Sequence, residues 1–245
     1  MPVIATLQRA NHGSHFRAYG LRGVAALIDP FLGGDHAWMS APTFPPHSHD
    51  GFSAVSYPFL DSETGIDNRD SLGTRNLIRP GGLHWATAGR GIVHKEVPAE
   101  TGKTVHSLQI FVNLARERQN IAPFALILEP QDVPVVQLPG AKVRVPIGSF
   151  RDACSALKPP TEVTMLDISL EEGVELAVPI AAGHCAFVMP IYGTARVDGD
   201  DFGHNELKLP VFPALDTPQA ITLQALPGSA KVMLFAGPPL HAPST

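Results

Sequence analysis

Several features that mark large classes of protein are scarce in this chain. Its 245 residues include only two cysteines, Cys154 and Cys185, and their separation matches no metal-binding or redox motif. We therefore expect two free, buried thiols and not a disulfide, as is usual in a reducing cytoplasm. Charged residues make up 17% of the chain, which is low for a helical bundle or a coiled coil.

Long runs of one kind of residue are missing as well. The net charge is −5 and no cluster of Lys or Arg could follow a phosphate backbone, so we expect no direct binding to nucleic acid. No apolar run approaches the ~20 residues that a membrane-spanning helix needs. The N-terminus has no basic segment followed by an apolar segment and a cleavage site, so we expect a cytoplasmic protein that is not secreted.

Turn residues and short apolar runs are abundant instead. The 24 prolines and 22 glycines are spread along the chain as separators between these runs. This pattern predicts an all-β protein with enough strands for two barrels or sandwiches. We expect a short helix near Leu114–Gln119. Strands are expected at Val24–Ile28, Phe52–Phe59, Asn76–Ile78, Ser107–Val112, Val133–Leu138, Val143–Ile147, Met165–Leu170, Val174–Val178, Ala186–Ile191, Glu206–Val211, Ala220–Leu226 and Lys231–Phe235.

A proline-rich segment, Ile121–Pro139, divides the chain into two halves, which predicts domains at residues 1–125 and 126–245. A short internal match supports this division. When VPIAAG (Val178–Gly183) is laid on PHSHDG (Pro46–Gly51), an apolar strand with a proline at the same offset follows each. In that alignment Pro179 and Ala181 replace two histidines, so we expect the second half to lack a metal site.

Histidine is concentrated in the first half, where eight of the 11 lie before residue 107. His47 and His49 precede an apolar strand, and residues i and i+2 of a strand point to the same side, about 6.6 Å apart. A lone pair of this kind is more often a surface pair than a metal site.

A second pair, His94 and Glu96, follows the flexible sequence Gly89-Arg90-Gly91. The 45 residues from His49 to His94 are enough for strands to circle a small barrel and return. Three imidazoles and a carboxylate suit Fe, Mn, Co, Ni or Cu, whereas a closed zinc site would normally show thiolates. We expect one divalent transition metal, with Fe as the first choice and Zn also possible.

The sequence HSHDG, together with RDSLGTRNLIRPGGLHWATAGRGIVHKE and VHSLQIFVNL, resembles the pirins, a branch of the cupin superfamily. The resemblance is dense from Phe44 to Leu114. It implies a bicupin, in which two β-barrels stand face to face and only the N-terminal one holds a metal. Carried over to this chain, the metal ligands implied by the family are His47, His49, His94 and Glu96.

The chain departs from the pirin pattern near the expected mouth of the barrel. Pro58 and an enlarged loop, Asp61–Asn68, replace a compact turn, and His84 stands where the family has a different polar residue. His84 is a rival ligand, but the motif is complete without it. His106 could orient a ligand imidazole or bond to backbone in the core, and Arg90 could pair with Glu96 or remain solvated.

The resemblance also implies activity. Several pirins cleave the ring of flavonols such as quercetin with O₂, and in this chain Glu96 would take the proton of the substrate hydroxyl. The alternative is a metal- or redox-sensing regulator that binds a partner protein without turnover. A sugar-phosphate isomerase or a hydrolase-like activity is a third hypothesis, although no cluster of phosphate-binding residues favours it.

Overall fold

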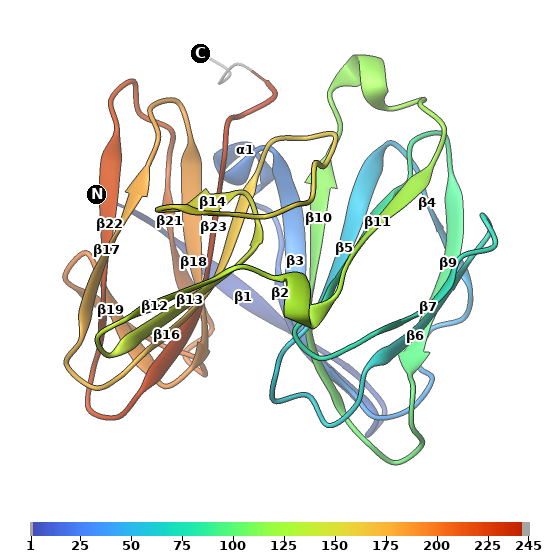
Figure 1. Ribbon diagram of the computed structural model, residues 1–245, viewed down its shortest axis with the longest axis horizontal. Coiled ribbons are helices and arrows are strands. Elements are labelled where there is room, and N and C mark those ends of the chain that lie inside the picture. Colours follow the sequence, from blue (N-terminus) through green and yellow to red (C-terminus); the bar gives the residue numbers. More distant parts are fainter. Residues whose placement is uncertain (1, 242–245) are drawn as a thin grey trace.

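The computed structural model describes residues 2–241, and most of them lie in β-strands and the turns between them. Two β-barrels stand side by side, with the first half of the chain on the right of Figure 1 and the second half on the left. The predicted all-β fold of two barrels is confirmed. A short helix and two 3₁₀ turns lie in connections: α1 (Ala25–Ile28), η1 (Arg116–Arg118) and η2 (Pro130–Asp132).

The first barrel is built from two groups of antiparallel strands. One group has the order β11-β8-β5-β10-β3-β2, and the other has the order β4-β9-β6-β7. The strands are β2 (Phe16–Leu21), β3 (Phe31–Met39), β4 (His47–His49), β5 (Phe52–Pro58), β6 (Ile66–Asp70), β7 (Arg75–Ile78), β8 (Leu83–Thr87), β9 (Ile92–Pro98), β10 (Val105–Asn113) and β11 (Phe124–Leu128).

The second barrel repeats this arrangement. Its groups have the orders β21-β18-β23-β16-β13-β12 and β17-β22-β19-β20, so β17, β18, β22 and β23 occupy the places of β4, β5, β9 and β10. The strands are β12 (Val135–Leu138), β13 (Ala141–Ile147), β16 (Thr164–Leu170), β17 (Glu175–Ile180), β18 (Cys185–Tyr192), β19 (Thr194–Val197), β20 (Asp200–Gly203), β21 (Lys208–Phe212), β22 (Gln219–Ala225) and β23 (Ala230–Gly237). Two short strands between β13 and β16, β14 (Ser149–Phe150) and β15 (Ala153–Cys154), pair with each other in a separate sheet.

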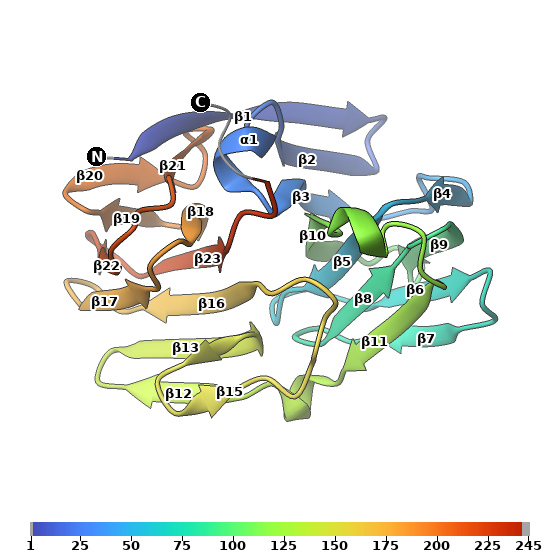
Figure 2. The ribbon, with the colours of Figure 1, turned by 90° about the horizontal axis from the view of Figure 1, so that it is seen from above.

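One strand belongs to both barrels. The first part of β1 (Val3–His12) pairs with β21, and its last six residues pair with β2, so that a single 13-stranded sheet runs through the molecule. Figure 2 shows β1 along the top of the view, reaching from β21 to β2. In the second barrel β1 takes the place beside β21 that β11 takes beside β8 in the first.

The largest apolar cluster lies where the barrels face each other, and both halves contribute to it. The ring of Phe31 lies 5.3 Å from that of Phe187 and 5.7 Å from that of Phe235, measured between centroids. A second large cluster, made only of second-half residues, fills the second barrel. Within residues 2–241 the first barrel has only small apolar clusters of its own, so its interior is open to polar groups.

A buried polar network also joins the two barrels. The Tyr57 hydroxyl donates to Asp167 Oδ2 at 2.8 Å, and Lys231 Nζ lies 3.0 Å from Asp167 Oδ1. Arg144 Nη2 donates to the Gly81 carbonyl at 2.8 Å. Because each charged group in this network has an ion-pair or hydrogen-bond partner, these interactions offset part of the cost of burying it between the barrels.

Some predictions need correction. The segment expected as a strand at Val24–Ile28 contains α1, because a run this short does not distinguish a strand from one helical turn. The helix expected near Leu114–Gln119 is the three-residue η1. Both cysteines are free as expected, but Cys154 is exposed and only Cys185 is buried. The predicted boundary at 125/126 falls inside β11, which pairs with β8.

Among the described residues, no helix is long and apolar enough to cross a bilayer.

Candidate metal centre

Three histidines come together because β4 and β9 are antiparallel neighbours. His47 lies directly opposite His94 in this pairing, and His49 lies two residues farther along β4 on the same side. The strand β9 begins after a turn in which Gly89 and Gly91 have positive φ values of 52° and 132°. At Gly89 an added Cβ would lie 2.2 Å from the Ile121 carbonyl oxygen, so this turn requires glycine.

The Nε2 atoms of the three rings converge. His49 Nε2 lies 3.0 Å from His94 Nε2, which lies 3.2 Å from His47 Nε2. Nitrogens bound about 2.1 Å from one ion, at right angles to each other, would be about 3.0 Å apart. No other group of three or more His, Cys, Asp or Glu ligand atoms comes within 4.8 Å in the described part of the chain. The residues present therefore fit one transition-metal ion.

The electrostatic environment keeps two of these imidazoles, His49 and His94, neutral. Burial, followed by the neighbouring histidines, lowers the pKa of His49 and of His94 from 6.5 to about 4. An imidazole binds metal only through an unprotonated nitrogen, so both rings are ready to act as ligands at neutral pH.

Glu96 lies two residues beyond His94 on β9 and lines the same cavity. Its carboxylate accepts hydrogen bonds from Ser56 Oγ at 2.9 and 2.8 Å, and one oxygen lies 3.9 Å from His94 Nδ1. Burial raises the pKa of Glu96, opposed by His84 and by the bond from Ser56. The structure thus places Glu96 beside the three histidines but outside their cluster, and its role as a fourth ligand stays a prediction.

A chain of polar side chains runs beneath the site. Asn68, opposite Glu96 in the β6–β9 pairing, donates from Nδ2 to Asn76 Oδ1 at 2.9 Å. This orientation leaves the Asn76 amide nitrogen to face His84 Nδ1 at 3.4 Å. The His84 proton then resides on Nε2, which is buried with no hydrogen-bond partner in residues 2–241. His84 is opposite Ser56 in the β5–β8 pairing, so it stands next to the group that holds Glu96.

The cavity that contains the site has a volume of about 340 Å³. Phe16, Phe44 and Phe111 line it together with Met39, which gives flat apolar walls. The polar groups are confined to the ligand side and to a few others, namely Asp35, Ser107 and Gln109. An apolar pocket with convergent polar groups at one end is typical of a site for a small organic molecule.

The structure decides between several alternatives for other residues. His84 was a rival ligand, but its ring does not belong to the group formed by His47, His49 and His94. His106 bonds neither to a ligand imidazole nor to backbone through its ring: Nδ1 meets Asp61 at 3.0 Å and Nε2 meets His36 at 2.7 Å. Arg90 is exposed and forms no ion pair within residues 2–241, as expected for a solvated turn residue. The enlarged loop is shorter than expected, because β6 begins at Ile66.

The second barrel has apolar residues in the corresponding places, but the alignment proposed from the sequence is one residue out of register. Pro179 faces outward, whereas Val178 and Ile180 belong to the apolar interior, and Ile221 lies opposite Val178. The connection to the next strand is one residue longer in the second barrel, since Ile180 precedes Val188 by eight positions and His49 precedes Ser56 by seven. The counterparts of His47, His49, His94, Glu96 and Ser56 are therefore Val178, Ile180, Ile221, Leu223 and Val188.

Two family models match this chain. The family model described as Pirin matches residues 18–112, and the one described as Pirin C-terminal cupin domain matches residues 165–245. A Pseudomonas aeruginosa protein provisionally named a quercetin 2,3-dioxygenase is 31% identical over 230 residues, covering 88% of this chain and 78% of that protein. Mouse pirin (Mus musculus) is 32% identical over 245 residues, covering 99% of this chain and 83% of mouse pirin.

Solved structures share the fold. GK1651 from Geobacillus kaustophilus superimposes with a TM-score of 0.88 at 27% identity, covering 99% of this chain and 97% of that one. The bacterial pirin YhhW from Escherichia coli, crystallised in complex with nickel(II), has a TM-score of 0.75 at 18% identity. The match covers 98% of this chain and 100% of that one.

Proposed function

Because this chain belongs to the pirin family of bicupins, we propose that it is a metal-dependent oxidoreductase that cleaves the ring of a flavonol such as quercetin with O₂. The observation that carries the proposal is the arrangement of the first barrel. Three imidazoles and a carboxylate of raised pKa meet at one end of an apolar cavity of about 340 Å³. The name of the Pseudomonas aeruginosa relative supports the choice of substrate class.

The cavity walls suit a planar aromatic molecule. Phe111 lies beside the end of β4 and the beginning of β5, since its ring centroid lies 5.9 Å from that of His49 and 5.6 Å from that of Phe52. A flavonol lying against Phe111 and Phe44 would present its polar edge to the histidines. These apolar walls also exclude water from the reacting edge.

The metal would be held by His47, His49 and His94, with Glu96 as the fourth residue of the set. When bound, such an ion supplies positive charge that stabilises a deprotonated hydroxyl oxygen. The nickel complex of the Escherichia coli pirin supports a divalent transition metal, and we keep Fe as the expected ion.

Glu96 would accept the proton of the flavonol 3-hydroxyl. Its raised pKa makes it a stronger base than an ordinary carboxylate, and Ser56 holds both of its oxygens in place. Loss of that proton makes the ring electron-rich and reactive toward O₂, and the cleavage releases CO. Glu96 is the catalytic residue of this proposal.

The test uses purified protein loaded separately with Fe, Mn, Co, Ni or Cu and mixed with quercetin under air. We expect loss of flavonol absorbance with release of CO, and Glu96→Gln should lower kcat by about 100-fold or more. The matched control is Glu100→Gln, which changes an exposed carboxylate outside the cavity. Absence of turnover with all five metals would exclude this substrate and favour the regulator that binds a partner protein.

A further inference from the structure

A second cavity, larger than the metal cavity, lies between the two barrels. Its volume is about 660 Å³, and both halves of the chain line it. Strands β3 and β10 separate the two cavities, because alternate residues point to opposite sides: Ala37 and Ser107 line the metal cavity, whereas Trp38 and His106 line this one. The inter-barrel cavity is therefore a distinct space, with its own polar groups.

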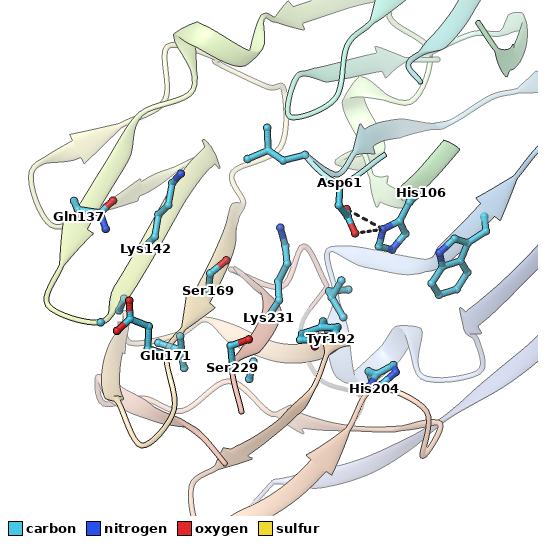
Figure 3. Close-up of a pocket in the computed structure, with 17 residues that line it drawn as sticks. Asp61, His106, Gln137, Lys142, Ser169, Glu171, Tyr192, His204, Ser229 and Lys231 are labelled. Carbon is cyan, nitrogen blue, oxygen red and sulfur yellow. Dashed lines mark hydrogen bonds and ion pairs between the residues drawn. The ribbon is translucent and has the colours of Figure 1, made fainter. Parts of the chain in front are cut away.

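The second barrel contributes a row of polar side chains to its floor. Five residues lie directly opposite one another on five adjacent strands and share one face: Gln137, Lys142, Ser169, Lys231 and Tyr192. Adjacent strands are about 4.8 Å apart, so the two lysines start about 10 Å from each other, with Ser169 between them. Figure 3 shows both ammonium groups extending from the sheet on either side of Ser169.

The two lysines differ in their partners. Lys231 is 19% exposed and pairs at 3.0 Å with the buried Asp167, which belongs to the network between the barrels. Lys142 is exposed, and no ion pair within residues 2–241 involves it. Glu171 stands at the outer rim, on the side away from Asp61 (Figure 3). The floor therefore offers an unpaired cation and a hydroxyl to an incoming anion.

The opposite wall presents an acceptor. Asp61 is 68% exposed, and its oxygens accept from His106 Nδ1 at 3.0 Å. His106 is itself fixed by His36 at 2.7 Å and by stacking on Trp38 with an interplanar angle of 6°. The bond from His106 lowers the pKa of Asp61, so the carboxylate is ionised and can accept a further hydrogen bond from a ligand hydroxyl.

Aromatic surface is exposed between these two ends. Tyr192 is 59% exposed, more than any other large hydrophobic residue of the described chain, and its ring stacks on His204 at an angle of 24°. Leu60, also on the cavity wall, is 47% exposed. Exposed apolar groups inside a concave site favour a ligand with a flat apolar body.

We propose that the inter-barrel cavity is a second ligand site that binds a planar phenolic carboxylate. The carboxylate lies over Ser169 and pairs with Lys142, the aromatic body lies against Tyr192, and the phenolic hydroxyl donates to Asp61. This site acts independently of the metal centre, because it shares no residue with the metal cavity.

The probe is 6-hydroxy-2-naphthoate. Two analogues accompany it: 2-naphthol, which lacks the carboxylate, and 2-naphthoate, which lacks the hydroxyl. Isothermal titration should give one saturable site, and each analogue should bind about tenfold more weakly, since a hydrogen bond to a charged group is worth that much. Lys142→Ala should weaken binding of the probe about tenfold and leave 2-naphthol unchanged. Asp61→Asn should weaken binding of the probe and leave the affinity for 2-naphthoate unchanged.

Two controls locate the effect. Lys208→Ala removes an exposed lysine of β21 outside the cavity and should bind the probe like the unmodified protein. Metal-free protein carrying His47→Ala and His49→Ala should also keep its affinity. The proposal is overturned by any of three results: no saturable binding at millimolar probe, equal affinity in the Lys142→Ala and Lys208→Ala proteins, or loss of binding when the two histidines are replaced.

Discussion

The two barrels have the same order of strands but different interiors. In the second barrel, Val178, Ile180, Ile221 and Leu223 close the space with apolar side chains. In the first barrel the corresponding places hold three histidines and a glutamate around an open cavity. The scaffold therefore does not decide whether a cupin barrel binds metal, since a few inward-facing positions on β4 and β9 do.

The polar interior of the first barrel lowers its stability. All six buried side-chain atoms that lack a hydrogen-bond partner in the described residues lie in the first half: His36 Nδ1, Ser53 Oγ, Asn68 Oδ1, Asp70 Oδ2, His84 Nε2 and His94 Nδ1. Each such atom costs about 1–3 kcal/mol when no water or ligand satisfies it. None of these atoms lies in the second barrel, whose interior is filled by apolar side chains.

The largest effect is expected from a substitution that removes the difference between the barrels at one position. Changing His94→Ile gives β9 the residue found at the same place in β22, and we expect metal content to fall about tenfold or more, because two histidines alone hold a divalent ion weakly. Elemental analysis of purified protein measures the change. His15→Ala, at an exposed histidine, is the control, and equal metal in the His94→Ile protein would refute the three-histidine centre.

The reverse change tests the second barrel. Ile221→His places an imidazole in an apolar core with no polar neighbour, and we expect the free energy of unfolding to fall by about 2–4 kcal/mol. Urea denaturation measures the loss. His94→Ile in metal-free protein should change stability by less than Ile221→His does. If both substitutions had the same effect, the two interiors would not differ in the way described.

A smaller effect is expected at Ser56, whose counterpart in the second barrel is Val188. Ser56→Val removes both hydrogen bonds to Glu96, and we expect metal affinity to fall about tenfold, as is usual for groups that orient a ligand. Competition with a chelator of known affinity gives the Kd. The control is Ser149→Val, at an exposed serine of the second barrel, and an unchanged Kd in Ser56→Val would show that Ser56 does not position Glu96.

A further expected effect is a dependence of stability on pH in the metal-free protein. Burial lowers the pKa of His36 to about 3 and the pKa of His49 and His94 to about 4, from 6.5 in the unfolded chain. Between pH 6.5 and about 4 the unfolded chain binds protons that the folded protein does not, so the free energy of unfolding falls on acidification. The raised pKa of Glu96 acts in the opposite direction but is a single group.

Tryptophan fluorescence can follow this effect in the first barrel, because Trp38 and Trp85 are the only two tryptophans and both lie there. We expect the urea midpoint to be lower at pH 5 than at pH 7. The substitution His36→Gln should reduce the difference between the two midpoints. Identical midpoints at both pH values would contradict the assigned burial of these histidines.

The sequence predicted the parts of the site that depend on local spacing. The i, i+2 relation places His47 beside His49 and His94 beside Glu96 on any strand, and the family motif joins the two pairs. Ser56 and Asn68 could not be identified in this way, because their contacts with Glu96 depend on the register between strands that are far apart in sequence. The same limit explains the one-residue error in the counterpart of His47, since a longer connection reverses which residues face inward.

The inter-barrel cavity could not be predicted from the sequence either. Lys142, Ser169 and Lys231 are separated by tens of residues, and only the strand order places them in one row. The loop around Asp61 was expected near the mouth of the metal cavity. It lines the other cavity instead, because β5 and β6 lie in different sheets and the chain passes between the barrels to join them.

The shared strand β1 has a consequence for how the molecule is assembled. Residues 3–6 pair with residues 208–211 of β21, so about 200 further residues must be made after them before that pairing can form. Contacts of such high sequence separation slow folding, and until they form β21 has an unpaired edge that can associate with other chains. The second barrel is therefore not complete until this pairing forms, and a fragment containing only the second half would expose the edge of β21 permanently.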